Sequence, residues 1–298
     1  MRLPAGGARG GPVTAPGLAL RYYPPAPPLT GLVSSYYVFE LAAGQVTDIL
    51  RAEVAQIRFL LRGHGYIAYG EHPFEPMPLA SLAGPSGSAI RFHAFGPFRL
   101  IGVGLLPAGW AALIGEEASR HADRLNDFSG LAPRLVGEAL LRMHEARDDR
   151  GLVAAADRLF LALAKRARTP PLWLTRPTDA WLVETPSPDV NQLVATLGMS
   201  NRQVERMVAR VYGASPKFLA RKYRTLQAAV RLGLRPELGW QGAAGTAFYD
   251  QSHFIRDFRQ FIGMTPGQFV AGGTPWLTRL TIAKRSGGAV LPKLIRAS

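Results

Sequence analysis

The chain has 298 residues, 47% of them hydrophobic, so it can bury a sizeable core and its length is typical of about two domains. It contains no cysteine, which excludes disulfides, thiolate metal sites and cysteine nucleophiles and fits a reducing compartment. The formal net charge is +14, and residues 171–298 carry 17 Lys and Arg against 7 Asp and Glu. This balance favours nucleic acid or an anionic membrane as a partner, although a solvated arginine-rich surface would give the same count.

The first 30 residues are rich in Gly and Pro, and we expect this segment to be extended or disordered. Its two arginines near the N-terminus are not followed by the apolar run of a secretory signal. The longest uncharged apolar run, Leu100 to Gly115, contains Pro107 and is shorter than the ~20 residues that a bilayer span needs. We therefore expect a cytoplasmic protein without a membrane partner.

Residues 31–107 consist of short apolar and aromatic runs separated by Gly and Pro, which predicts a strand-rich sandwich or barrel. Beyond them, apolar residues recur every three to four positions and predict helices over Trp110 to Ile114, Leu135 to His144 and Leu152 to Ala167. Prolines at 170–171 and 186–188 indicate breaks. We predict an α+β chain with a strand-rich domain over 31–170, an all-α domain over 178–271 and a basic tail over 272–298.

No catalytic constellation emerges from the strand-rich part. A metal site would draw on His64, His72, His93, Glu71 and Glu75, but no His-x-His pair is followed closely by a Glu, so ordinary polar residues are favoured. A nucleophile elbow of the G-x-S-x-G type is missing, and so is a phosphate-binding loop with lysine. We expect no enzyme activity, no catalytic residues, no metal and no cofactor.

Aromatic residues on the expected strands are numerous enough to line an apolar pocket, although aromatics on strands more often form plain core. These residues are Tyr36, Tyr37, Phe59, Tyr66, Tyr69 and Phe92. The ligand-binding residues therefore stay undefined by the sequence.

The sharpest signal is an internal repeat, in which Gly213-Ala214-Ser215-Pro216 recurs as Gly263-Met264-Thr265-Pro266. In the first copy, the apolar residues from Val190 to Leu197 share one helix face, and Gly198 supplies a turn. Ser200 opens a second helix, where Gln203 completes a capping box. Two short helices joined by a glycine turn predict a helix-turn-helix unit.

The second copy repeats this arrangement with a first helix over Trp240 to Phe248 and a turn near Asp250, which is a plausible helix cap. Its second helix buries four apolar residues, Phe254, Phe258, Phe261 and Ile262. Between the copies, Phe218 to Leu234 has a helical pattern and predicts a rigid connector.

The outward faces of the two second helices are basic and rich in hydrogen-bonding groups. Arginine pairs with guanine and Asn or Gln with adenine in the major groove, whereas the alternative role is a solvated helix surface. We expect Ser200 to be chiefly a cap and Arg210 to contact phosphate. The candidate DNA-binding residues are Ser200, Asn201, Arg202, Gln203, Arg206 and Arg210 in the first unit, and Gln251, Ser252, His253, Arg256 and Arg259 in the second.

These residues resemble those of the AraC/XylS family of transcription activators, in which two such units are joined by one linker helix. The resemblance covers about 85 residues and is carried by Leu197-Gly198-Met199-Ser200 with Val204 and Arg206, by Gly213-Ala214-Ser215-Pro216, by Phe248-Tyr249-Asp250-Gln251-Ser252-His253-Phe254, and by Phe258, Gly263 and Thr265-Pro266. It implies double-stranded DNA and RNA polymerase as partners.

The first domain is loosely similar to the small-ligand sensor or dimerisation domains that precede such regions, around Leu113-Ile114-Gly115-Glu116 and Asp127-Phe128-Ser129-Gly130-Leu131. That similarity implies a small-molecule effector and a homodimer. The second unit departs from the family at Gly242, Thr246 and Ala247, which predicts a thinner core there.

Three other classes of protein compete with a sequence-specific regulator. A non-specific architectural DNA binder would bind every duplex equally, and an enzyme on the strand-rich domain would need a catalytic set that the sequence lacks. A DNA-repair methyltransferase with a similar DNA-binding part would need reactive cysteines, which are absent.

Overall fold

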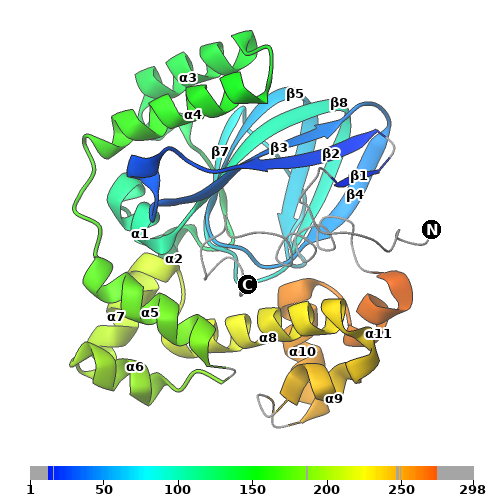
Figure 1. Ribbon diagram of the computed structural model, residues 1–298, viewed down its shortest axis with the longest axis vertical. Helices are drawn as coiled ribbons and strands as arrows, with labels where there is room; N and C mark the ends of the chain where they lie inside the picture. The colour runs from blue at the N-terminus through cyan, green and yellow to red at the C-terminus, as the bar shows by residue number, and fades with distance from the viewer. Residues whose placement is uncertain (1–12, 16, 186, 246–247, 249, 274–298) are drawn as a thin grey trace.

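The computed structural model describes residues 13–15, 17–185, 187–245, 248 and 250–273 (Figure 1). Within them, nine strands form one antiparallel sheet with the order β1-β2-β3-β8-β5-β7-β9, while β4 pairs with β8 and β6 with β5. The strands are β1 (Val13–Ala15), β2 (Leu18–Tyr23), β3 (Val33–Leu41), β4 (Gln45–Leu50), β5 (Gln56–Tyr69), β6 (Glu75–Pro76), β7 (Ala80–Ala83), β8 (Ile90–Leu105) and β9 (Leu125–Asp127). The predicted strand-rich first part is confirmed.

The two long strands β5 and β8 bend the sheet and divide its packing into two cores. They pair along almost their whole length, with register shifts between Leu60 and His64. The first half of β8 also pairs with β4 and its second half with β3, so these two strands share the other edge of β8. Alternate residues then face different cores: Ile57 and Phe59 lie in one and Leu60 in the other.

The six aromatics named above as a pocket lining do not share one core. Tyr36 and Phe59 are fully buried in the first core, whereas Tyr69 and Phe92 lie in the second. Tyr66 is 36% exposed. These side chains therefore do not surround a common cavity.

The expectation of disorder before residue 31 is wrong for the part that the structure describes. Strand β2 pairs with β3 from Leu18 opposite Leu41 to Tyr23 opposite Tyr36, and a short 3-10 turn (Pro27–Leu29) follows it. Leu18, Leu20 and Leu29 are buried, so apolar contacts across the sheet order a segment that its Gly and Pro content marked as disordered. Residues 1–12 and 16 lie outside the described residues.

Short helices follow the sheet and close the first core. They are α1 (Pro107–Gly109), a π-helical turn (Trp110–Ile114), α2 (Ala118–His121), a 3-10 turn (Ser129–Leu131), α3 (Pro133–Glu145) and α4 (Asp149–Ala164). Helices α3 and α4 form a hairpin over one face of the sheet (Figure 1), as the periodicity predicted. Val136, Leu159 and Phe160 are its buried contacts with the sheet.

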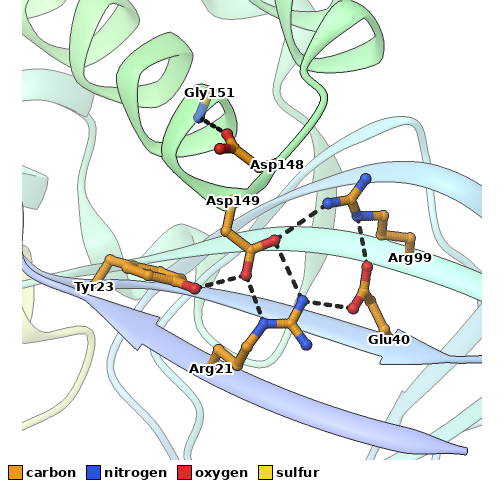
Figure 2. A network of polar contacts seen from close by, with 7 residues as sticks. All are labelled: Arg21, Tyr23, Glu40, Arg99, Asp148, Asp149 and Gly151. Atoms are coloured by element: carbon orange, nitrogen blue, oxygen red, sulfur yellow. Dashed lines mark hydrogen bonds and ion pairs between the residues drawn. The ribbon is translucent and has the colours of Figure 1, made fainter. Parts of the chain in front are cut away.

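A polar network fastens this hairpin to the sheet at the start of α4 (Figure 2). The carboxylate of Asp149 accepts hydrogen bonds from Arg21 Nε at 2.6 Å, from Tyr23 Oη at 2.6 Å and from Arg99 Nη2 at 3.2 Å. Glu40 of β3 bridges the two arginines, which lie on the strands on either side of it, β2 and β8. These hydrogen bonds hold the pKa of Asp149 below its usual value, although burial opposes them.

The C-terminal part is helical and packs on both sides of one long helix, α8. Its helices are α5 (Leu172–Glu184), α6 (Val190–Leu197), α7 (Asn201–Tyr212), α8 (Pro216–Leu234), a 3-10 turn (Pro236–Leu238), α9 (Gly239–Ala244), α10 (Gln251–Ile262), α11 (Pro266–Gln268) and a final π-helical turn (Phe269–Gly273). The predicted α+β class is therefore confirmed. None of the described helices is long and apolar enough to span a bilayer.

Two helical boundaries differ from those expected. The proposed start of the DNA-binding region, residue 178, lies inside α5, which begins at Leu172 and buries Leu174, Trp181 and Leu182 against α6 to α8. The first helix of the second unit ends at Ala244, where Gly245 takes a φ of +55°, rather than at Phe248. Residues 246, 247 and 249, and the expected tail from 274 onward, lie outside the described residues.

The helical part is docked onto the end of the sheet through α8. Lys222 of α8 is buried, and its Nζ donates to the backbone carbonyls of Glu53 at 2.9 Å and Ser86 at 2.7 Å. Two backbone hydrogen bonds of 2.7 Å join the same surfaces, from Ala52 N to Phe261 O and from Ala89 N to Gln260 O.

The two repeated glycines also lie at this interface. Both end a helix with a positive φ, +85° at Gly213 and +88° at Gly263. A Cβ atom would lie 2.5 Å from Pro85 Cγ in the first case and 2.6 Å from Ile49 Cγ2 in the second. Each repeat therefore presents the same glycine turn to the sheet domain, which fixes how the two units sit on it.

Candidate DNA-binding surface

The first unit places α7 with one face buried and the other in solvent. Val204, Val208 and Val211 are buried against α5, α6 and α8, which leaves the opposite face free. The side chains of Ser200, Asn201, Arg202, Gln203, Arg206 and Arg210 are all exposed. The turn before α7 is the predicted one, because Gly198 ends α6 with a φ of +63°.

The predicted capping box at the start of α7 is confirmed and limits what Gln203 can do. Ser200 Oγ accepts from Gln203 N at 3.4 Å, and Gln203 Oε1 accepts from Ser200 N at 3.0 Å and from Ser200 Oγ at 2.9 Å. The acceptor half of the Gln203 amide is thus already engaged. A bidentate contact with adenine would require this box to open, so Arg202 and Arg206 are the freer groups for base contacts.

The second unit presents α10 in the same manner. Phe254, Phe258, Phe261 and Ile262 are fully buried, and the rings of Phe254 and Phe258 pack edge to face with centroids 5.4 Å apart. The side chains of Gln251, Ser252, His253, Arg256 and Arg259 are exposed.

Asp250 caps α10 as predicted and also holds His253. Its Oδ1 accepts from His253 N at 2.8 Å, and its Oδ2 lies 2.9 Å from His253 Nδ1. These contacts lower the pKa of Asp250, the backbone hydrogen bond from His253 being the main cause. The imidazole at the exposed start of α10 is therefore oriented by its own cap.

A half-buried acid beneath α7 was not among the predicted residues. Tyr212 Oη donates to Asp179 Oδ1 at 2.6 Å and contacts Thr175 O at 3.0 Å, which ties α7 to α5. Burial raises the pKa of Asp179 to about 7, while the hydrogen bond from Tyr212 opposes that rise. Little in the sequence indicates this contact, because an Asp in a helical run usually lies on the solvated face.

Lys222 was not predicted either, although its place in the sequence is unusual. It lies on the apolar stripe of α8 with Leu219, Tyr223 and Leu226, where a lysine is unusual. The sequence could mark the anomaly but not its partners, since both carbonyls belong to residues more than a hundred positions away.

The histidines and glutamates of the first domain do not converge. His93 stacks on Phe95 with centroids 4.4 Å apart, while His64 and His72 are exposed. Among the residues that the structure describes, no three His, Asp or Glu side chains are grouped so as to hold a metal ion.

Comparison with known proteins agrees with this geometry. Residues 193–272, which run from α6 past both exposed helices, match the family model described as "Helix-turn-helix domain". These residues are an AraC-type helix-turn-helix domain, the DNA-binding module of a family of transcription regulators. No curated protein matches the chain.

Three solved structures are similar to this one at low sequence identity. An apo variant of ToxT from Vibrio cholerae strain SCE256 is 10% identical, with 86% of this chain and 97% of that chain covered and a TM-score of 0.43. A second structure of ToxT from Vibrio cholerae is 11% identical, with 79% and 97% covered and a TM-score of 0.43. The AraC-like transcriptional activator CuxR is 10% identical, with 72% and 88% covered and a TM-score of 0.29.

Proposed function

We propose that this chain is a sequence-specific transcription regulator that contacts successive segments of the major groove with α7 and α10. The observation that carries the proposal is that every candidate residue of both units is exposed, on two helices fixed to the same long helix α8. Arg202 and Arg206 contact bases, Ser200 and Arg210 contact phosphates, and the second unit uses Gln251, Ser252, His253, Arg256 and Arg259.

The two parts of the fold have different roles, regulation and DNA binding. Residues 31–170 with β2 form the regulatory domain, and the DNA-binding domain extends from Leu172 to residue 271, because α5 completes the core of the first unit. The docked surface around Lys222 is the route by which the first domain acts on the second. A small-molecule effector, a homodimer, contact with RNA polymerase and a cytoplasmic location complete the proposal by analogy with the family.

The test is selection of bound duplexes from a random pool by the full chain. A regulator enriches one motif with two half-sites about one helical turn, ~34 Å, apart. The comparison is with the variant that has alanine at both Arg202 and Arg206, which should no longer enrich the motif of the first half-site. Equal recovery of all sequences by the unaltered chain would instead identify a non-specific architectural binder.

A further inference from the structure

A hollow of about 390 Å³ opens beside α10, on the side that faces α8. It is separate from the outward face of α10, although His253 and Arg256 border both. Arg221 and Arg224 of α8 form its opposite wall. The lining residues are Arg221, Arg224, Phe248, His253, Arg256 and Asp257.

Asp257 organises this hollow from below. Its carboxylate is almost buried, with a side-chain exposure of 6%. Oδ1 pairs with Arg221 Nη2 at 2.5 Å, and Oδ2 lies 3.6 Å from Arg224 Nη2. One carboxylate thereby positions two guanidinium groups, each with N–H donors to spare.

The charge of the hollow is not balanced by the residues that line it. Three guanidinium groups face a single carboxylate. Arg224 is only 22% exposed, and its guanidinium carbon lies 4.4 Å from the centroid of the Phe248 ring. Its Nε is buried without a hydrogen-bond partner among the described residues. Burial lowers the pKa of Arg224, and an anion placed here would oppose that effect.

We propose that Arg221 and Arg224, held by Asp257, form a phosphate-binding pocket that holds one phosphodiester of bound DNA. Guanidinium groups match phosphate oxygens with paired N–H donors, and an open, charged hollow suits a group carried by a polymer better than an enclosed small ligand. The pocket lets the linker helix clamp the backbone while α10 lies over the groove. This inference rests on the proposed function.

The first measurement is the salt dependence of binding to a duplex that the unaltered chain has selected. Each lost phosphate contact lowers the slope of log K against log salt by about 0.9. Arg224→Gln should show that loss, and its affinity should fall about tenfold on preferred and scrambled duplexes alike. The matched control is Arg235→Gln, which removes an exposed arginine at the end of α8 and should leave the slope unchanged.

The second measurement locates the phosphate and guards against misfolding. Neutral methylphosphonates are introduced one at a time along the duplex. At one position the methylphosphonate should lower the DNA affinity of the unaltered chain about tenfold and leave the affinity of Arg224→Gln unchanged. If Arg224→Gln fails to fold because Asp257 loses a partner, Arg221→Gln carries the same test, since Asp257 then keeps Arg224 as a partner.

The outcomes separate this inference from the function on which it rests. If the slopes of Arg224→Gln and Arg235→Gln agree, or no methylphosphonate distinguishes the variant from the unaltered chain, the pocket is not a phosphate site although DNA binding stands. If the unaltered chain itself shows no salt-dependent DNA binding, the proposed function fails first. If millimolar inorganic phosphate at constant ionic strength stabilises the unaltered chain but not Arg224→Gln, and no methylphosphonate position distinguishes the two proteins, the pocket takes a free phosphate compound, and its assignment to DNA is overturned.

Discussion

Arg202 and Arg206 lie on the exposed face of α7, one turn apart. The buried residues Val204 and Val208 hold the helix in place. If either contacts a base, its replacement by alanine should cost about 1–3 kcal/mol on the preferred site and relax the preference at one base position. Binding titrations on the selected duplex and its single-base variants measure this. Uniform weakening on all sequences would make the residue a phosphate contact, and unchanged binding would return it to plain surface.

Asp179 predicts a pH dependence of stability. Its pKa is raised from the model-compound value of 3.8 to about 7, so the folded chain keeps a proton that the unfolded chain loses between those values. Stability from this group is full at low pH and decreases as pH rises toward 7, by up to about 1.4 kcal/mol per pH unit. Asp179→Asn keeps an acceptor for Tyr212 and removes the titration.

Chemical denaturation at a series of pH values checks this expectation. The free energy of unfolding should decrease from acidic to neutral pH more steeply in the unaltered chain than in Asp179→Asn. Parallel curves for the two proteins would show that Asp179 is ionised in the folded state.

The residues that the sequence could identify are those with local partners. Ser200 with Gln203 and Asp250 with His253 are pairs three positions apart, so the helix geometry itself brings them together. Lys222 and Asp179 act through residues distant in the chain, and Arg221 and Arg224 become a pocket only when α10 packs on α8. Composition and residue spacing do not predict such contacts.

At the scale of elements, helix periodicity predicted α3, α4, α6, α7, α8 and α10 because each buries one regular stripe. Helix α5 was not predicted, since Pro177 interrupts its pattern and its apolar residues contact three other helices. Strand β2 was hidden by the glycines and prolines around it. Its order comes from pairing with β3, which no local pattern reports.

The two units differ in their first helices, and this difference predicts an asymmetric footprint. Helix α6 has 8 residues, whereas α9 has 6 and contains Gly242, where a Cβ would lie 2.9 Å from Leu238 Cβ. A glycine inside a helix costs about 0.5–1 kcal/mol relative to alanine, so α9 braces α10 less firmly than α6 braces α7. We expect strong base preference in the half-site that faces α7 and weaker preference in the half-site that faces α10.

Operators scrambled in one half-site at a time provide the comparison, with alanine at Arg206 and at Arg256 as the paired variants. Scrambling the first half-site should lower the affinity of the unaltered chain more than scrambling the second, and this loss should be smaller in Arg206→Ala. If scrambling the half-site that faces Arg256 lowers the affinity as much as scrambling the half-site that faces Arg206, the shorter helix α9 has no functional consequence.

At the scale of the whole molecule, the sheet domain holds the DNA-binding domain through Lys222, through two backbone hydrogen bonds and through the turns at Gly213 and Gly263. Lys222→Met removes the donor to the Ser86 carbonyl and one donor to the Glu53 carbonyl, which still accepts from Ser86 N at 3.1 Å. Leaving the buried Ser86 carbonyl unsatisfied costs about 1–3 kcal/mol. The interface should therefore open more often while each domain stays folded.

Hydrogen exchange of the amides of Ala52 and Ala89 reports this opening, because both donate across the interface. Their exchange should be at least about tenfold faster in Lys222→Met, while amides inside the sheet are unaffected. The matched control is Lys217→Met, an exposed lysine on the same helix. Equal protection of Ala52 and Ala89 in both variants would show that Lys222 does not hold the domains together.

The central claim is that two helix faces of this chain bind DNA, and the salt dependence of that binding tests it most directly. Residues 171–298 carry 17 basic against 7 acidic residues. If six to eight phosphates are contacted, the affinity of the full chain for its selected duplex should fall by about a thousandfold or more between 50 and 200 mM salt, because condensed counterions are released on binding. An affinity that stays nearly constant over that range would contradict the account.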